Sequence, residues 1–416
     1  MMISAAAIAI RSAAAAVRGV WRRTGAFASA GATLLVLLIV APATSLAELN
    51  VAGHGNVRYE YDSNVFALPK GTPTPGASFG DSGITYLGGL DATYLWQGQK
   101  MILSGVADQT RYITDTDLDR TEYTAVGTLM WVLDPLINGT ARLSKERHVE
   151  PAYQAIPTNQ LLIESLWNAL ATATYRFKPF WALDVSAGVR EDDLPQVGTT
   201  GDLLLREVSQ HAGLNYGNPA SFTGGLAVEY LNGQFSGGLL ADQLSYRQWS
   251  AEMVGQRSSG DLSTFNGALG YTLRTIRLGH QRSGGITGSI GYRRKLTGKT
   301  TVHLEADRAV TTYIAAAGSE VDTSATADIE WQPTVKTEVV LGYVWMRSRF
   351  AAETTPFEVN VARTDRFGTA HMEINYRPRK WLLVHPYVRL LRRSSDVPLF
   401  EFTSNIAGLE LTATFP

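Results

Sequence analysis

The feature that most constrains the fold is a unit in which apolar and polar side chains alternate every second residue. Its clearest copy runs from Val321 to Arg347. As far as Trp331, one set of alternate residues is apolar apart from a threonine, and the other set is polar or charged. A strand with this pattern has one apolar and one charged face. A turn around Pro333 follows, and an apolar-rich run begins at Val339, so the pattern predicts an antiparallel hairpin.

The same unit recurs along the chain with a spacing of roughly 40 residues, the length of two strands and two connections. Short connections alternate with long polar ones, as in an outer-membrane barrel with short periplasmic turns and longer external loops. The connections predict about 18 strands, with 16 as the alternative, and both termini on the periplasmic side. The short turns are expected at 97–99, 134–135, 178–179, 217–219, 258–260, 297–298, 333–334 and 378–379, and the long loops at 66–82, 114–120, 151–161, 191–202, 232–241, 275–283, 313–320, 349–362 and 394–401.

Aromatic residues supply a second signal, because rings settle at both interfaces of a membrane barrel. A soluble β-sandwich would explain the alternation but not two aromatic belts. We therefore interpret residues 48–416 as an all-β, transmembrane, antiparallel up-and-down β-barrel in the cell outer membrane. The belt beside the short turns is predicted to contain Trp96, Trp131, Trp181, Phe222, Tyr292, Trp331 and Trp381, and the other belt Tyr59, Tyr61, Tyr112, Tyr123, Tyr230, Tyr313 and Tyr343.

The first 47 residues have the features of an export signal. A basic segment ending at Arg23 precedes an apolar core at 32–40, and Ser45 to Ala47 form a small-x-small cleavage motif before Glu48. A membrane anchor is disfavoured, because the core of about ten residues is shorter than the ~20 that a spanning helix needs. We expect cleavage after Ala47, a first strand close to Glu48, and no room for a plug or a periplasmic partner domain.

Composition limits the possible chemistry. A net charge of −1 does not favour nucleic acid as a partner. The absence of cysteine excludes disulfides, thiolate metal sites and a cysteine nucleophile. The segment 115–119 resembles the start of a calcium loop, but Arg120 occupies the glycine position and the bidentate glutamate is missing. No nucleophile elbow or phosphate loop occurs, so we expect no cofactor, no metal and no catalysis.

The polar faces of the strands are predicted to line the lumen with acids and bases mixed, which does not indicate a pore selective for one sign. His303 with Glu305, and His371 with Glu373, lie two residues apart on one strand face and could serve acid–base chemistry. We interpret them instead as hydrogen-bonded pairs of the wall. The predicted solute contacts are Arg58, Glu60, Arg142, Glu146, His148, Glu207, His211, Glu229, His303, Glu305, Asp307, Asp328, Glu330, His371 and Glu373, and the other predicted wall residues are Asp91, Asp184, Arg190, Arg293, Asp322, Asp365 and Glu410.

Four motifs resemble those of a known barrel family. They are the opening strand Arg58–Leu68 with its Tyr-Asp-x-Asn-hydrophobic pattern, Tyr94–Arg111 followed by Asp117–Tyr123, Ser283–Tyr292 followed by Leu296–Thr300, and Trp331–Thr334 with Lys336. The family is that of the EpsL-like, or β-barrel porin type 2, proteins associated with exopolysaccharide and exosortase loci. Such barrels usually end in an aromatic residue that the barrel assembly machinery recognises. Because this chain ends in proline, Phe415 is the expected assembly signal.

The resemblance implies a passive channel or accessory pore for exopolysaccharide export, with periplasmic export proteins as partners. The residues alone predict a wide barrel with a polar lumen, surrounded by outer-membrane lipid. The alternative is a general diffusion porin for small solutes. A third hypothesis, less favoured, is an outer-membrane enzyme acting on lipid or glycan.

Overall fold

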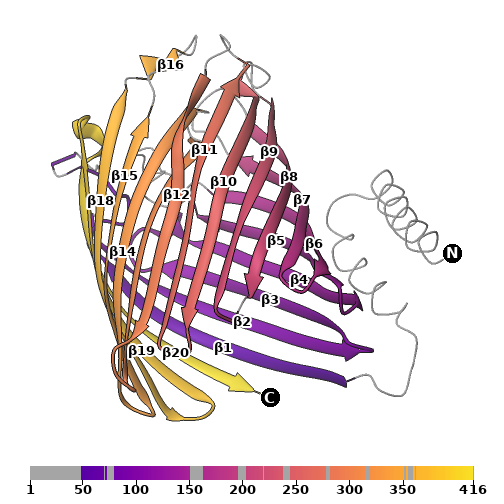
Figure 1. The fold of residues 1–416 in the computed structure, drawn as a ribbon. Coiled ribbons are helices and arrows are strands. Elements are labelled where there is room, and N and C mark those ends of the chain that lie inside the picture. The colour runs from indigo at the N-terminus through magenta and orange to yellow at the C-terminus, as the bar shows by residue number, and fades with distance from the viewer. Residues whose placement is uncertain are drawn as a thin grey trace, which may run out of the picture. The chain divides into compact units, whose positions relative to one another are not determined.

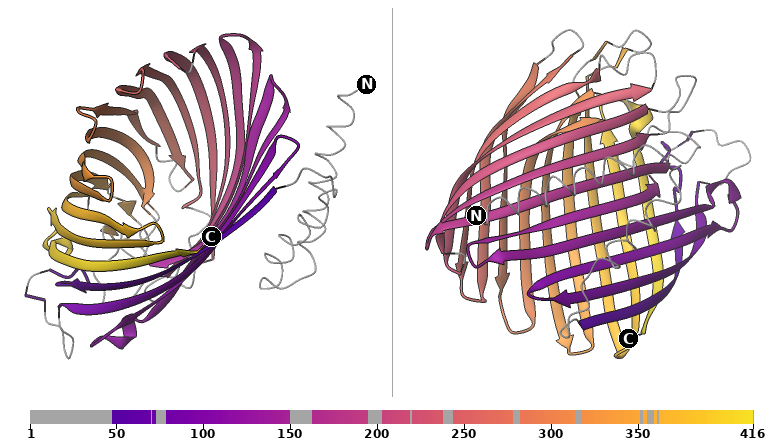
Figure 2. Two further views of the ribbon diagram at one scale, coloured as in Figure 1. Left: turned by 90° about the horizontal axis from the view of Figure 1, so that it is seen from below. Right: turned by 90° about the vertical axis from the view of Figure 1, so that its right-hand side faces the viewer.

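In the computed structural model, the described residues are 48–69, 71–72, 79–149, 163–194, 203–218, 220–237, 244–277, 282–313, 318–350, 353–354, 359–360 and 362–415. They contain one 18-stranded antiparallel sheet that closes on itself (Figures 1 and 2). The predicted signal peptide, including Ala47, lies outside the described residues. In the described part, no helix is long and apolar enough to cross a membrane.

The strands follow one another around the barrel in chain order. Each strand of the barrel pairs with the next barrel strand, with β18 following β15, and β1 pairs with both β2 and β20, which closes the cylinder. The elements are β1 (Glu48–Asp62), β2 (Asp81–Trp96), β3 (Gln99–Tyr112), the 3-10 helix η1 (Thr116–Leu118), β4 (Arg120–Asp134), β5 (Ile137–Val149), β6 (Ile163–Lys178), β7 (Trp181–Leu194), β8 (Leu203–Asn218), β9 (Phe222–Gly237), β10 (Tyr246–Ser259), β11 (Ser263–Ile276), β12 (Arg282–Lys295), β13 (Thr300–Tyr313), β14 (Gly318–Thr334), β15 (Thr337–Phe350), β16 (Glu353–Thr354), β17 (Val359–Asn360), β18 (Arg363–Arg379), β19 (Leu382–Ser395), the 3-10 helix η4 (Pro398–Phe400) and β20 (Phe402–Phe415).

The predicted barrel of about 18 strands is confirmed, and the short turns fall at the predicted positions or one to two residues after them. The small hairpin of β16 and β17 lies within the long connection between β15 and β18. The long loop predicted at 232–241 begins too early, since β9 continues to Gly237 and β10 begins at Tyr246. The prediction failed there because the alternation reverses. Phe235 faces inward and is buried, while polar Gln234 and Ser236 face outward.

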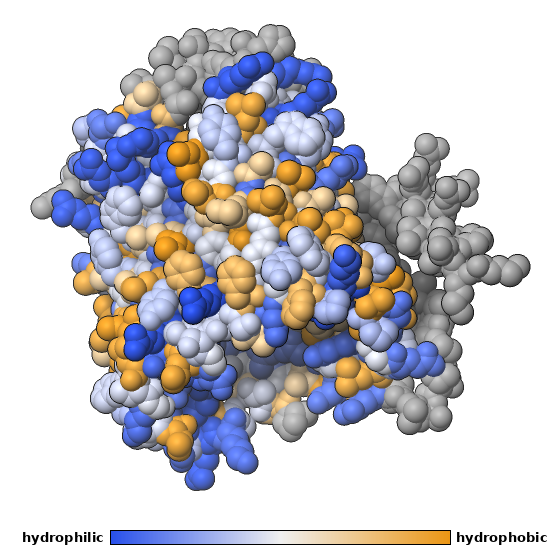
Figure 3. Space-filling view, in the orientation of Figure 1, coloured by the Kyte–Doolittle hydropathy of each residue, from blue (hydrophilic) through white to orange (hydrophobic). Residues whose placement is uncertain are grey.

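The two faces of the sheet differ in chemistry. On β9, Leu226 and Val228 are 66% and 51% exposed. On the opposite face of the sheet, the side chains of Asp192 and Asp365 are completely buried. Because no second layer covers the outside of a single closed sheet, the face with buried charges is the inner one. Figure 3 shows the outer face, on which apolar side chains gather over the middle of the wall.

The inner face also has an apolar part that the prediction of a polar lumen missed. Six buried residues pack together on and beside the loop ends of β8 to β11, with Leu231 packed against them. The six are Leu203, Leu205, Phe235, Leu244, Tyr246 and Ile276.

The aromatic prediction is largely confirmed. The strand residues of the belt beside the short turns face outward, and Trp381 is half exposed in a turn. On the other belt, Tyr230 packs against Trp249 with ring centroids 4.6 Å apart, and Tyr343 also faces outward. Tyr112 is a correction, because the register puts it on the inner face beside Arg120. The side chain of Tyr313 is not among those described.

The junction of β1 and β20 explains why the opening motif has its residues. The Asp62 carboxylate accepts a hydrogen bond from Ser404 of β20. The Asn64 amide donates to the carbonyl oxygens of Leu68 (2.9 Å) and Thr403 (3.1 Å), and its own oxygen accepts the Leu68 amide (3.1 Å). The Tyr-Asp-x-Asn-hydrophobic pattern therefore forms a corner that ties the first strand to the last.

Candidate functional site: the inner wall of the barrel

The pairing register places all of the predicted solute contacts on the inner face. Three directly opposite pairs fix the parity of their strands: Arg58 with Glu410, His211 with Glu229, and His303 with Asp328. Residues two apart on a strand face the same way, and directly opposite residues on paired strands also face the same way. The remaining predicted residues are linked to these three pairs by such steps around the closed sheet. Their role as solute contacts remains a prediction. The remaining solute contacts so placed are Glu60, Arg142, Glu146, His148, Glu207, Glu305, Asp307, Glu330, His371 and Glu373, and the other wall residues so placed are Asp91, Asp184, Arg190, Arg293, Asp322 and Asp365.

Each of the six histidines in the described strands lies beside a carboxylate of another strand. The nitrogen–oxygen distances are 3.3–3.5 Å for five of them. The sixth, His211, is directly opposite Glu229 in the register. The five measured pairs are His54–Asp91, His148–Glu164, His303–Glu330, His371–Asp328 and His385–Glu373.

The two histidine–glutamate pairs predicted within single strands are therefore wrong. His303 contacts Glu330 and not Glu305, and His371 contacts Asp328 and not Glu373. Both partners belong to other strands: Glu330 is diagonal to His303 on β14, and Asp328 reaches His371 past Gly342 of β15. Diagonal neighbours on one face are within reach of long side chains. Glu373 instead contacts His385 and Arg389, at 3.5 and 3.4 Å.

Three of the inner contacts between two side chains span two strand spacings in the described strands, and each crosses a glycine. Such a contact joins the first and third of three adjacent strands, and the glycine of the middle strand is directly opposite both partners. A Cβ at the glycine would collide with a bridging side chain. The sequence signal is a glycine at an inward position between two long polar side chains. The three bridges are Asp328–His371 over Gly342, Glu60–Tyr387 over Gly408, and Glu207–Tyr246 over Gly233.

Replacing Gly342 by alanine should break the Asp328–His371 bridge. The added Cβ would overlap the Asp328 carboxylate and the His371 ring, so we expect a loss of stability of about 1–3 kcal/mol from overpacking. Gly105→Ala is the matched control, because a Cβ there meets nothing within 4 Å. Urea titration of both variants in detergent measures the difference, and equal midpoints would contradict the bridge.

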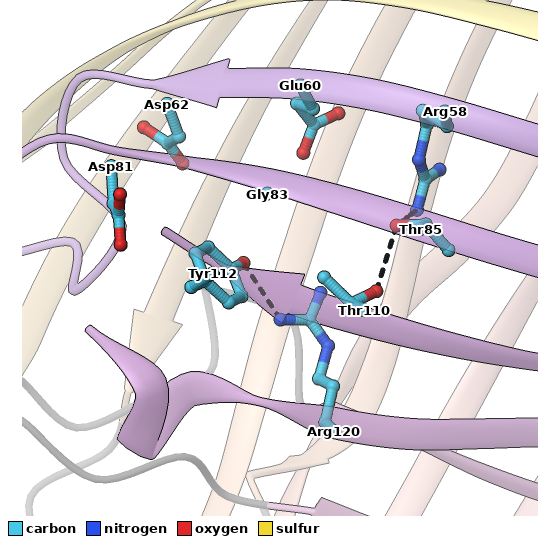
Figure 4. Close-up of a pocket in the computed structure, with 9 residues that line it drawn as sticks. All are labelled: Arg58, Glu60, Asp62, Asp81, Gly83, Thr85, Thr110, Tyr112 and Arg120. Atoms are coloured by element: carbon cyan, nitrogen blue, oxygen red, sulfur yellow. Dashed lines mark hydrogen bonds between the residues drawn. The ribbon is translucent and has the colours of Figure 1, made fainter. Parts of the chain in front are cut away.

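A pocket on the inner wall of β1 to β4 brings together charges of both signs (Figure 4). The guanidinium of Arg120 donates to the Tyr112 hydroxyl (2.8 Å) and to Glu122 (2.9 Å). Arg58 reaches the Thr85 hydroxyl, at 3.3 Å. Carboxylates, guanidinium groups and a phenol that converge in this way offer both donors and acceptors to a hydroxylated solute. The lining residues are Arg58, Glu60, Asp62, Asp81, Gly83, Thr85, Thr110, Tyr112 and Arg120.

Sequence reasoning found only Arg58 and Glu60 of this pocket. It assigned Asp81 and Arg120 to loops, although they begin β2 and β4, and it assigned Tyr112 to the outer belt. The alternation of side chains could have placed Tyr112 on the inner face. Its neighbour Arg111 faces outward, and Tyr112 lies opposite the inward-facing Gly83.

Carboxylates within and beside the acidic loop between β3 and β4 hold its backbone. The Asp119 carboxylate accepts the Tyr112 amide at 2.7 Å, and Asp81 accepts the amides of Thr114 and Asp115 at 2.8–3.2 Å. Burial raises the pKa of the Asp115 carboxyl, and the charges of Asp81 and Asp117 raise it further. Among the described residues, no group of three or more histidines and carboxylates is arranged to hold a metal ion.

A second ionic cluster is buried at the loop end of β18 and β19. The Asp365 carboxylate contacts Arg393 at 2.6 Å and Arg363 at 3.1 Å. The Arg363 guanidinium lies 3.7 Å from the centroid of the Phe400 ring, which belongs to η4, and 4.1 Å from that of Phe350. Charged groups without access to water need such close partners. We assign this cluster a structural role, because it fixes the connection after β19 against the wall.

A closed antiparallel barrel with an apolar outer face and an ionic inner face is an outer-membrane β-barrel. This protein is therefore a β-barrel of the cell outer membrane.

No family model and no curated protein matches the chain. Among solved structures, the outer membrane protein OpdK from Pseudomonas aeruginosa is 10% identical, with a TM-score of 0.48 over 88% of this chain and 99% of that one. OccK9 (OpdG) from the same organism is 13% identical, with a TM-score of 0.47 over 89% and 98%. The siderophore receptor PirA, also from Pseudomonas aeruginosa, is 11% identical, with a TM-score of 0.46 over 88% and 80%. Likenesses at this level carry no argument about the solute.

Proposed function

We propose that this protein is a passive outer-membrane passage for an exopolysaccharide. The observation that carries the proposal is the inner wall, where acids, bases and hydroxyls are distributed over nearly all strands and not gathered in one constellation. A polymer of hydroxylated sugars can exchange many weak hydrogen bonds with such a wall as it moves. Passage requires binding that is weak and spread over many sites, since strong binding at one site would hold the polymer.

The ionic contacts of the wall support the same function. Several of the inward acids lie within 4.0 Å of a histidine or an arginine of the same or a nearby strand, as in Glu373 with His385 and Arg389. At these positions the charges are balanced in place, and the solute meets paired polar groups. The resemblance to barrels of exopolysaccharide loci supports a polymer as the solute. Polymerisation, or a periplasmic export protein, would supply the driving force.

The second candidate is a general diffusion porin for small solutes. It is favoured by the number of strands, because barrels of 16 to 18 strands leave an aqueous channel. The two candidates share the fold and the wall, and they differ in whether a polymer uses the passage.

Deleting the gene in a polymer-producing strain should leave polymer in the periplasm while its synthesis enzymes remain active. The polymer is measured in medium and periplasm, with the wild-type gene restored on a plasmid as the control. Unchanged polymer outside the cell, together with free conductance of ions and sugars by the purified protein, would establish the general porin instead.

An enzymatic function is tested by replacing His303, Glu305, His371 and Glu373 together by glutamine or asparagine. We expect a modest change in conductance or export, because these side chains contribute only part of a distributed wall. Heat-modifiable migration on gels verifies that the variant folds. A folded variant that has lost all activity would show that these residues perform chemistry.

A further inference from the structure

The outer face of the barrel carries a group of arginines near the loop ends of β13, β15 and β18. Arg347 of β15 is directly opposite Arg366 of β18 and, on its other side, opposite Thr323 of β14. Thr323 is in turn opposite Arg308 of β13. Arg347 lies within electrostatic range of Arg308, Arg349 and Arg366. We call these four residues the arginine patch.

The patch lies at the upper edge of the apolar band. Arg347 and Arg349 are the fourth and fifth outward-facing residues after Val339, which is opposite Trp331 of the belt beside the short turns. The outward-facing residues between them are Leu341, Tyr343 and Trp345, so the face is apolar up to the patch. A tilted strand needs about 9–11 residues to cross the hydrocarbon layer, which places the arginines at the level of the lipid headgroups on the loop side.

In the part of the chain that the structure describes, the patch has no acidic partner on the outer wall. Within the described residues, the outer faces of β12 to β15, β18 and β19 contain no aspartate or glutamate. Arg308 is partly satisfied by the Ile286 carbonyl (2.9 Å) and the Thr323 hydroxyl (3.1 Å). The Nε atom of Arg347 is shielded from solvent and has no hydrogen-bond partner among the described residues. By contrast, Arg206 on the outer face of β8 lies 3.4 Å from Glu191.

We propose that the arginine patch binds a phosphate group of the phosphorylated glycolipid that forms the outer leaflet of the outer membrane. Four like charges held close together need an anion, and the planar guanidinium fork matches a phosphate in two-point contacts. Clusters of basic side chains at headgroup level bind anionic lipids for this reason. Trp345 and Tyr343, just below on the same face, provide apolar surface for the acyl chains. The inference rests on the membrane location and not on which solute crosses the barrel.

The test uses the full-length mature protein in detergent, with native mass spectrometry to count bound lipid. The probes are lipid A with both phosphates, the same lipid without phosphates, and inorganic phosphate. The wild-type protein should retain phosphorylated lipid A selectively. The variant Arg347→Gln/Arg366→Gln should bind it roughly tenfold or more weakly, given the contribution of each basic side chain to binding at a lipid surface. Arg206→Gln is the matched control, an outward arginine already paired with an acid, and should bind as the wild type does.

A second variant separates charge from geometry. Arg347→Lys/Arg366→Lys preserves the charge and should fold if the glutamine variant does not, yet it lacks the two-point contact and should bind measurably more weakly than wild type. Heat-modifiable migration verifies the fold of each variant. Equal binding of lipid with and without phosphates, or wild-type binding by both double variants, would overturn the proposal. Displacement of the lipid by inorganic phosphate at equal concentration would also overturn it, because the patch would then be a free-anion site.

Discussion

Replacing Ala327 by arginine is expected to destabilise the barrel by roughly 2–4 kcal/mol, the cost of an arginine on the lipid face near the bilayer midplane. Ala327 is on the outer face of β14, between Ala325 and Ile329, directly opposite Leu304 and Tyr343. A guanidinium there has no acid or water within reach. Urea titration of folding in detergent or lipid, followed by heat-modifiable migration, measures the loss.

The adjacent residue provides the control. Asp328 is on the inner face, where its side chain is partly exposed and contacts His371 at 3.4 Å. Asp328→Asn should therefore cost less than about 1 kcal/mol, as expected for a partly solvated ion pair. Equal damage from the two substitutions would mean that β14 has the wrong register or that the outer face does not contact lipid.

Replacing Asp365 by asparagine should destabilise the protein by about 3–5 kcal/mol, the cost of breaking a buried ionic contact from one side. The substitution preserves the shape of the side chain but leaves Arg363 and Arg393 buried on either side of a neutral group. Because both arginines and the carboxylate have almost no access to water, solvent cannot compensate for the lost charge.

The exposed pair of Arg206 and Glu191 is the control for this prediction, and Arg206→Gln should change stability by no more than about 1 kcal/mol. Denaturant midpoints and slopes for both variants measure the difference. A loss at Asp365 as small as that at Arg206 would indicate that water reaches the cluster and that it does not hold the connection after β19 in place.

The fold could be predicted from the sequence because a membrane barrel has two chemically opposite surfaces. Lipid requires every second residue, the outward-facing set, to be apolar. The alternation along Val321–Trp331 therefore already assigns each side chain to the outer or the inner face. The same alternation placed inward the residues predicted for the wall. The alternation fails where a strand leaves the membrane, which is why the extension of β9 to Gly237 was missed.

The partners of the wall residues could not be predicted, because a partner depends on register between strands and not on spacing along one strand. His371 reaches Asp328 two strands away, and Tyr387 reaches Glu60 from the opposite end of the sequence. Neither contact is visible without knowing that Gly342 and Gly408 leave the space between them open. The pocket of β1 to β4 was missed for a related reason, since Asp81 and Arg120 stand at strand ends, where alternation is too short to read.

The junction of the first and last strands has a mechanical consequence. Ten residues of β1, from Gly53 to Asp62, pair with β20. Three side-chain bonds also cross it: Asp62 with Ser404, Asn56 with Thr412, and Glu60 with Tyr387 beyond β20. Parting the wall here would break the ladder and all three bonds together, so the joint should not serve as a sideways gate into the bilayer. Cargo that enters this cylinder is expected to leave through its ends.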